Sequence, residues 1–153
     1  MTDTDVTFAE VLDCYVEMTY NGDLCSIRFI KSQQNLHEKV TQKASFELKE
    51  YFKGRRTDFS CEFDLSKLSA FAQKVLNETS KIKYGKTITY SELADKIGSR
   101  AVRAVGGALS NNPIPIVIPC HRVVAKKGLG GYSAGAGIKK KLLEFEKKLA
   151  NNL

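Results

Sequence analysis

The stretch TYSELADKIGSRAVRAVGGALS, residues 89–110, decides the fold of the second half of this chain. Its first four residues have the T-x-x-E spacing of a capping box, which predicts a helix that begins after Thr89 and ends at Ile97. A second helix is predicted over 100–110, with one apolar face (Val102, Val105, Leu109) and one open face (Arg100, Arg103, Gly107). Two short helices joined by a glycine-containing turn are typical of a helix-turn-helix, although an ordinary helical hairpin fits this pattern equally well.

Downstream of these helices, an apolar run ends in a group of reactive residues. Prolines at positions 113, 115 and 119 exclude a helix, so a strand is predicted that ends at Cys120, His121 and Arg122. Positive charge near Cys120 would raise its thiolate fraction and make it a nucleophile. Neighbouring strand residues point to opposite faces, so Cys120 and His121 can cooperate only if the chain turns, as Pro119 favours, or if a water bridges them. The alternative is a buried, inert thiol beside a satisfied histidine.

The first part of the chain has the pattern of a small sheet covered by a helix. Residues 11–18 and 24–30 alternate like strands, and Asn21-Gly22-Asp23 between them is a strong turn signal. Apolar residues at every fourth position predict an amphipathic helix over 34–53. The segment 55–64 lacks periodicity and is predicted to be a linker.

The second part begins near residue 66 and contains mainly helices. Ser66 is expected to cap a helix that buries apolar residues between 68 and 76. A glycine-rich loop, 128–137, and a final helix over 138–150 follow the cysteine. We therefore expect an α/β (α+β) protein with an N-terminal sheet-plus-helix domain, 1–65, and a C-terminal winged-helix-like helix-turn-helix domain, 66–153.

Charge is distributed unevenly between these two parts. Residues 1–65 hold 8 Lys and Arg against 12 Asp and Glu, whereas residues 66–153 hold 16 against 5. A strongly basic half suggests a polyanionic partner, with nucleic acid the leading candidate, although a solvated basic surface fits the charge alone equally well. No stretch resembles a membrane span or signal peptide, and the cysteines show no C-x-x-C spacing. We expect an intracellular protein with reduced thiols, nuclear in a eukaryote and cytoplasmic in a prokaryote.

Four short motifs together resemble the O6-alkylguanine-DNA alkyltransferase family. They are Arg103-Ala104-Val105-Gly106, Asn112-Pro113-Ile114-Pro115, Pro119-Cys120-His121-Arg122-Val123 and Gly131-Tyr132-Ser133. The resemblance covers roughly residues 66–147, whereas the N-terminal third resembles the family only in its order of elements and in residues 51–54. It implies direct DNA repair, in which an alkyl group moves irreversibly from O6-alkylguanine to Cys120 and each molecule acts once.

The resemblance also implies roles for individual residues. Cys120 would be the nucleophile, His121 would take its proton through a water, Glu146 would orient the imidazole, and Asn112 would brace this network. The substrate base would be held by six residues: Tyr90, Pro115, Val123, Tyr132, Ser133 and Lys139. DNA would be bound through its minor groove by Arg103, Ala101, Ala104, Gly107 and Arg122, with Arg103 filling the stack after the damaged base has rotated out.

Three other functions remain open from the sequence. A non-catalytic module that recognises alkylation damage would lack the cysteine that is present here. A cysteine hydrolase of acyl groups would turn over repeatedly, and a winged-helix regulator would not need Cys120.

No cofactor or metal is expected, because Cys14, Cys25, Cys61 and His37 do not match the zinc site that some relatives carry. The protein is expected to be a monomer in solution. Ala134, where many relatives have glycine, leaves the accepted size of the alkyl group open.

Overall fold

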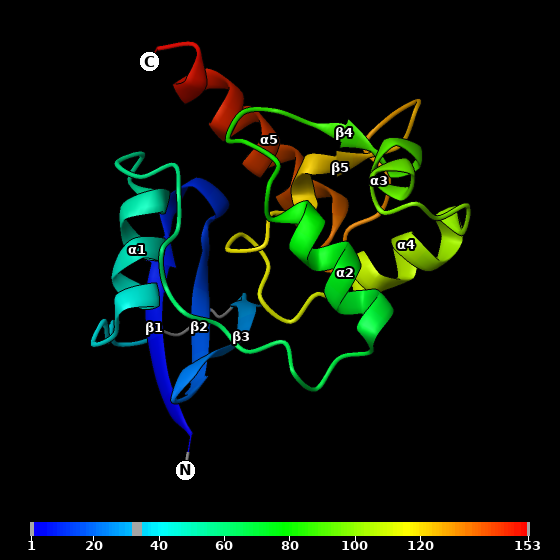
Figure 1. The fold of residues 1–153 in the computed structure, drawn as a ribbon. Coiled ribbons are helices and arrows are strands. Elements are labelled where there is room, and N and C mark those ends of the chain that lie inside the picture. Colours follow the sequence, from blue (N-terminus) through cyan, green and yellow to red (C-terminus); the bar gives the residue numbers. More distant parts are fainter. Residues whose placement is uncertain (1, 32–34, 153) are drawn as a thin grey trace. The chain divides into compact units, whose positions relative to one another are not determined.

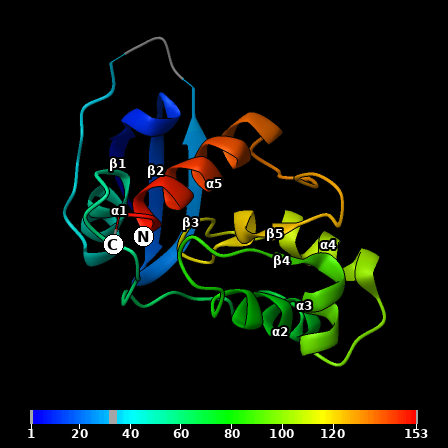
Figure 2. The same ribbon diagram turned by 90° about the horizontal axis from the view of Figure 1, so that it is seen from above.

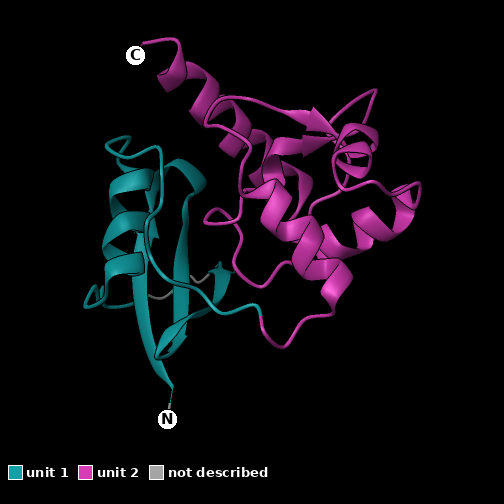
Figure 3. Ribbon diagram, in the orientation of Figure 1, with its two compact units in different colours: residues 1–65 teal, residues 66–153 magenta. Residues whose placement is uncertain are grey.

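A computed structural model describes residues 2–31 and 35–152 of the chain. The chain divides into two compact units, residues 1–65 and 66–153, which Figure 3 shows in different colours. Each unit has its own secondary structure and its own buried apolar residues. Within the described ranges, no helix is both long and apolar enough to cross a membrane.

The first unit is a three-stranded antiparallel sheet with one helix on it (Figure 1). Its elements are β1 (Asp3–Ala9), a short 3-10 turn (Glu10–Leu12), β2 (Cys14–Asn21), β3 (Asp23–Ile30) and α1 (Lys43–Phe52). Alternate residues of β2 are buried, from Cys14 to Tyr20, as expected for a sheet with one covered face. The predicted hairpin is confirmed, with Gly22 at φ +80° in its turn.

Strand β1 was not predicted from the sequence, because two of its inward residues are polar. Asp5 and Thr7 are 1% and 0% exposed, so the apolar alternation that marks a half-buried strand is missing. The Asp5 carboxylate accepts hydrogen bonds from the N–H groups of Thr41 and Gln42 at 2.9 and 3.1 Å and from the hydroxyl of Ser45 at 2.6 Å. Asp5 therefore binds the two N–H groups just before α1 and a hydroxyl in the first turn of that helix, which ties the start of α1 to β1.

This contact also corrects the predicted start of the helix. Helix α1 begins at Lys43, and residues 35–42 are not helical; residue 34 of the prediction lies outside the described ranges. Lys39 instead pairs with Val6 through two backbone hydrogen bonds of 2.9 Å, which extends the edge of β1. The four-residue spacing of apolar residues over 34–42 was thus outweighed by backbone pairing with a strand distant in sequence.

The second unit contains four helices and a two-stranded parallel sheet (Figures 1 and 2). Its elements are α2 (Ala70–Thr79), β4 (Ile88–Thr89), α3 (Tyr90–Lys96), α4 (Val102–Ser110), a 3-10 turn η2 (Cys120–Arg122), β5 (Val123–Val124) and α5 (Ala136–Ala150). The predicted capping box is confirmed, since the side chains of Thr89 and Glu92 each bind the other residue's N–H. Ser69, not Ser66, caps α2.

Helices α3 and α4 form the predicted helix-turn-helix, and both pack against α2. Val105 and Leu109 of α4 are buried, as expected, but Val102 is 39% exposed because the helix only begins at that residue. Arg103, Ala104 and Gly107 lie on the exposed side of α4. The exposed face of α4 therefore carries one cation beside small residues.

The apolar run before Cys120 does not form the predicted strand. Ile116 has φ +74°, and the N–H of Ile118 donates to the carbonyl of Ile114 at 3.0 Å, which closes a tight turn. Positive φ is unusual for a β-branched residue, so burial of all three isoleucines, each at most 1% exposed, must hold this conformation. The strand comes only after the cysteine, where β5 pairs with β4.

Replacing Asp5 tests the polar link between β1 and α1. Asp5→Ala removes the acceptor of several buried donors, so the free energy of unfolding should fall by about 2–4 kcal/mol in urea titrations. Burial raises the pKa of Asp5, but the hydrogen bonds from Ser45, Thr41 and Gln42 outweigh it and leave the pKa lowered. The stabilisation should therefore be complete above the unfolded-state pKa and be lost as pH falls through the folded-state pKa.

The matched control for this test is Asp3→Ala, which changes an exposed aspartate at the start of the same strand. It should change stability by less than about 0.5 kcal/mol. Equal losses for the two variants would show that the carboxylate of Asp5 does not hold α1.

Candidate active site

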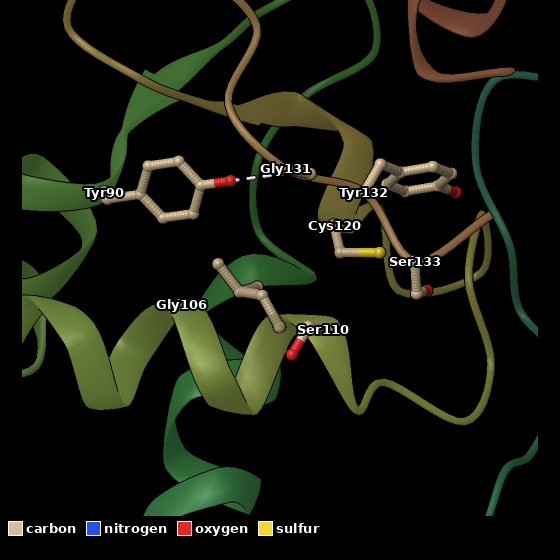
Figure 4. Close-up of a pocket in the computed structure, with 8 residues that line it drawn as sticks. Tyr90, Gly106, Ser110, Cys120, Gly131, Tyr132 and Ser133 are labelled. Carbon is tan, nitrogen blue, oxygen red and sulfur yellow. Dashed lines mark hydrogen bonds between the residues drawn. The ribbon is translucent and has the colours of Figure 1, made fainter. Parts of the chain in front are cut away.

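A cavity of about 260 Å³ lies between α4 and the segments that carry Cys120 and residues 131–133 (Figure 4). It is bounded by eight residues: Tyr90, Gly106, Leu109, Ser110, Cys120, Gly131, Tyr132 and Ser133. The sequence predicted four of these as functional residues, namely Cys120, Tyr90, Tyr132 and Ser133. The cavity is large enough for a flat aromatic group, and its walls are mainly apolar with a few polar groups.

Cys120 is presented by a turn and not by a strand end. It begins the 3-10 turn η2, in which the N–H of Arg122 donates to the carbonyl of Pro119 at 2.9 Å. Cys120 is 6% exposed, and burial raises the pKa of its thiol, although the Asn112 amide, the Tyr132 hydroxyl and the Lys139 ammonium oppose that rise. The positive charge of Lys139 favours the thiolate, in the direction that the sequence analysis gave, but burial outweighs it, so the thiol needs a base.

His121, the residue after the cysteine, forms a fully buried pair with Glu146. The imidazole Nε2 lies 2.7 Å from Glu146 Oε2, and the two residues are 0% and 1% exposed. Burial raises the pKa of Glu146, but hydrogen bonds from His121 and Arg122 outweigh it and leave the carboxyl ionised with a lowered pKa. An ionised carboxylate only accepts, so Nε2 carries the proton that it donates.

The other imidazole nitrogen is therefore an unprotonated acceptor when His121 is neutral. Burial lowers the pKa of His121, the Glu146 carboxylate opposes this, and Arg122 and Lys139 lower it further, so the neutral form is favoured. Nδ1 is buried and makes no hydrogen bond to any residue in the described ranges. A buried polar atom without a partner is unusual and marks a position where a proton can be taken up.

Asn112 braces the turn that leads to the cysteine. Its amide Nδ2 donates to the carbonyl of Ile118 at 2.9 Å, and its Oδ1 accepts from the N–H of Ile114 at 3.0 Å. Both contacts close the 112–118 segment on itself. The side chain thus holds the loop that aims Cys120 into the cavity.

The glycine-rich loop is hydrogen-bonded to the side chains of Tyr90 and Lys139. Tyr90 donates its hydroxyl to the carbonyl of Gly131 at 3.3 Å, the dashed contact in Figure 4. Lys139 is fully buried and donates to the carbonyls of Val123 and Gly131 at 2.7 and 2.9 Å, with Nζ 5.7 Å from the centre of the Tyr90 ring. Lys139 does not bound the cavity, so its side chain does not contact a molecule bound there. Its role in this geometry is to hold the loop at β5.

Several other predicted residues do not bound the cavity. Pro115 and Val123 are buried and do not bound the cavity, because Pro115 belongs to the 114–118 turn and Val123 pairs with Ile88 in the small sheet. Ala101, Arg103, Ala104 and Gly107 are exposed on or just before α4. Gly106, Leu109 and Ser110 bound the cavity and were missed, since small and apolar residues of a helix carry no chemical signature in a sequence.

Arg122 requires a correction. It was predicted to contact DNA, but it is 5% exposed and its guanidinium is directed inward. Its Nε and Nη2 donate to the two oxygens of Glu146 at 2.8 and 3.0 Å, and its Nη1 donates to the carbonyl of Ile82 at 2.6 Å. A side chain held by three internal contacts cannot reach an external phosphate.

The described ranges contain no group of three or more His, Cys, Asp or Glu side chains that could hold a metal ion. The side chains in and next to the cavity supply a buried thiol on Cys120, the hydroxyls of Tyr90 and Tyr132, and, on the residue after Cys120, the His121 imidazole with one unpartnered nitrogen. These groups can deprotonate the thiol and direct it at an electrophile in the cavity.

A helix-turn-helix whose second helix shares a cavity wall with a buried cysteine defines a class of helix-turn-helix domain that encloses a thiol. The family model described as "6-O-methylguanine DNA methyltransferase, DNA binding domain" matches residues 70–148, and the chain belongs to this family. The match includes Cys120, His121 and Glu146, and it includes the whole of α3 and α4.

Curated relatives and solved structures agree with this assignment. The chain is 49% identical over 102 residues to a methylated-DNA--protein-cysteine methyltransferase of Metallosphaera sedula (67% of this chain, 65% of the relative). It is 56% identical over 79 residues to that of Methanocaldococcus vulcanius (52% of this chain, 48% of the relative). The matched parts are less than two thirds of the length of either relative.

The structural likeness extends over both units. The crystal structure of Mycobacterium tuberculosis O6-methylguanine methyltransferase superposes with a TM-score of 0.83 at 34% identity, over 97% of this chain and 94% of the other. The O6-methylguanine-DNA methyltransferase of Pyrococcus kodakaraensis gives 0.78 at 27% identity, over 95% and 99%. The expected α+β fold, with an N-terminal sheet and a C-terminal helix-turn-helix, is thereby confirmed.

Gly130 gives a direct test of how the loop holds Tyr90. It has φ +75°, and a Cβ there would lie 2.7 Å from Tyr90 Cε2 and 2.8 Å from its hydroxyl. Gly130→Ala should therefore lower the free energy of unfolding by about 2–4 kcal/mol, from backbone strain plus the clash, and should displace the Tyr90 ring. Urea unfolding and the ring resonances of Tyr90 measure the two effects.

Gly128→Ala is the matched control, because Gly128 also has positive φ, +100°, but a Cβ there meets nothing within 4 Å. It should cost about 1–2 kcal/mol and leave Tyr90 unchanged. If both variants cost the same and Tyr90 does not move, the contact with Gly130 has no role in shaping the cavity.

Proposed function

We propose that this protein repairs DNA directly, by irreversible and stoichiometric transfer of an alkyl group from O6-alkylguanine in DNA to Sγ of Cys120. The observation that carries this proposal is the buried thiol of Cys120, which lines a cavity of about 260 Å³ and is followed in sequence by the histidine of the buried His121–Glu146 pair. Membership of the family supports the same chemistry. The protein would be a single-turnover methylated-DNA--protein-cysteine S-methyltransferase.

The reaction begins with removal of the thiol proton. Sγ–H passes its proton through a water to Nδ1 of His121, and Glu146 stabilises the resulting imidazolium through Nε2–H. The thiolate then attacks the alkyl carbon, the S–C bond forms as the C–O6 bond breaks, and the electron pair stays on the guanine oxygen. The base recovers one proton, so the proton lost by the thiol ends on guanine. The product is a thioether without an electrophilic carbonyl, so water does not regenerate Cys120.

The cavity residues assist the departure of guanine. Charge that develops on the base needs nearby donors, and the backbone N–H of Ser133 is suited to that role because Ser133 bounds the cavity. The hydroxyl of Tyr90 would join it by exchanging its 3.3 Å contact with the carbonyl of Gly131 for one with the base. Tyr132 forms a wall for the base. Lys139 acts indirectly, since its ammonium is already bound to the carbonyls of Val123 and Gly131.

DNA is proposed to bind along the exposed face of α4. Ala101, Ala104 and Gly107 leave room for close approach to a minor groove, and the surplus of basic residues over 66–153 favours the phosphate backbone. A base within a duplex cannot reach Cys120, so the damaged nucleotide must rotate out of the stack, at a cost of a few kcal/mol. Arg103, exposed on α4, would occupy the space that the base leaves.

The second candidate is a non-catalytic module that binds alkylation damage without accepting the alkyl group. Only the DNA-facing surface would be needed for that role. The buried Cys120 with a base behind it would then have no purpose, which is why we favour transfer. A hydrolase or a winged-helix regulator is less consistent with the same pair, because neither explains a thiol closed off beside a helix-turn-helix.

The first experiment is incubation of the full chain with a duplex that contains one O6-methylguanine. Intact mass and peptide mapping should show one methyl group on Cys120 and no further reaction after one equivalent. Cys120→Ala should abolish transfer and keep DNA affinity. An unmodified protein that still binds the damaged duplex would instead indicate the recognition module, and repeated release of product would indicate a hydrolase.

A second prediction concerns Arg103. Arg103→Ala should slow transfer from duplex DNA by about tenfold or more, because the vacated stack is no longer filled, and should leave reaction with free O6-methylguanine base unchanged. Single-turnover rates with the two substrates give the comparison. Lys67→Ala, an exposed change before α2, serves as the control for loss of one positive charge. Equal losses with both substrates would exclude a role for Arg103 in flipping.

A further inference from the structure

Arg122 is a buried arginine whose contacts all lie within the second unit. Two of its nitrogens bind the two oxygens of Glu146, at 2.8 and 3.0 Å, and a third donates to the carbonyl of Ile82 at 2.6 Å. The ring of Tyr84 lies over the guanidinium, with its centre 5.6 Å from Cζ. Such a bidentate pair fixes the orientation of a carboxylate, which a single contact does not.

We propose that Arg122 is a positioning residue for the transfer reaction: it holds Glu146 so that Oε2 receives His121 Nε2–H, which leaves Nδ1 free as the proton acceptor. This inference rests on the proposed function, since the freed nitrogen matters only if the thiol is deprotonated. Oε2 is shared by the two donors, His121 Nε2 at 2.7 Å and Arg122 Nη2 at 3.0 Å. Rotation of the carboxylate would therefore break both contacts together.

The positive charge of Arg122 has a second effect on the same pair. A buried carboxylate with histidine as its only partner would favour the imidazolium, whose Nδ1 is protonated and cannot accept. The guanidinium neutralises Glu146, so the neutral imidazole is retained.

The remaining groups around His121 do not replace this effect. Glu146 and Lys139 face it from α5, and Cys120 and Arg122 flank it in η2. Helix α2, which also packs against η2, contributes the buried residues Val75, Leu76 and Thr79, none of which titrates. Lys139 is bound to two carbonyls, whereas Arg122 binds both oxygens of Glu146. Tyr84 and Tyr132 also lie within the electrostatic influence of Glu146, but burial raises the pKa of both phenols, so neither supplies charge near neutral pH.

The histidine nitrogens report on this arrangement without any substrate. The chain has two histidines, His121 and the exposed His37, so ¹⁵N-labelled protein gives two separable sets of ring resonances. Wild-type protein near neutral pH should show His121 protonated at Nε2 only. Arg122→Gln should convert His121 partly to imidazolium at that pH and leave His37 unchanged. Arg100→Gln, which removes an exposed arginine of the same unit, should change neither histidine.

The transfer rate provides the second readout. Arg122→Gln should slow single-turnover transfer by about tenfold or more at neutral pH, with a larger loss at acidic pH and a smaller one at alkaline pH. Arg122→Lys restores the positive charge but not the two-nitrogen contact with Glu146. It should therefore recover the neutral imidazole of His121 and part of the transfer rate. A purely structural role would give the same fractional loss at every pH.

The outcomes separate the two hypotheses. If the wild-type chain transfers no alkyl group, the proposed function fails, while the histidine spectra still test the contact. An unchanged His121 in Arg122→Gln, or an Nδ1-protonated His121 in the wild-type protein, would overturn the role of Arg122, and the second result does not depend on a variant folding. If Arg122→Gln weakens DNA binding and leaves the pH profile of the transfer rate unchanged, the sequence-based prediction that Arg122 contacts DNA would be supported instead.

Discussion

The second unit depends on the buried carboxylate of Glu146 and on the hydrogen bonds that it accepts. Glu146 lies on α5, is 1% exposed, and accepts from His121, Arg122 and, at 3.3 Å, from the N–H of Gly85. Burying an ion without partners costs several kcal/mol, so the helix, the cysteine turn and the segment before β4 must meet at this point. Gly85 permits the approach, because a Cβ there would lie 2.7 Å from that of Ala150. The position of Cys120 follows from this meeting point.

Burial around Cys120 has opposite effects on the thiol and on its base. The same exclusion of water raises the pKa of Cys120 and lowers that of His121, so proton transfer between them is unfavourable at rest. Glu146 offsets this by stabilising the imidazolium as it forms. The site is thus arranged so that the thiolate exists mainly when it is needed, which distinguishes it from a cysteine activated by permanent positive charge.

Local signals predicted the parts of the fold that local interactions determine. The capping box at Thr89, the two helices that follow and the hairpin around Gly22 need only neighbouring residues, and all are present. The sequence did not reveal β1, because its buried Asp5 is satisfied by residues some 36 positions away. In the site, the resemblance singled out Cys120, His121 and Glu146, whereas the inward direction of Arg122 depends on where α5 packs. That information is tertiary and leaves no periodicity in the sequence.

Under the proposed function each molecule is consumed by one reaction, and such a protein has a particular reason to bury its nucleophile. An exposed thiolate would be spent on any small electrophile or oxidant, and each such event would cost a whole molecule. Cys120 is 6% exposed and neutral at rest, so only a group that fits the cavity and stays there reaches it. Selectivity then comes from access to the thiol as much as from its reactivity.

The helix-turn-helix contributes to this selectivity directly, because Gly106, Leu109 and Ser110 belong both to α4, the helix proposed to face DNA, and to the cavity wall. Under the proposed function, a base held out of the duplex beside α4 would therefore enter the cavity that Cys120 lines.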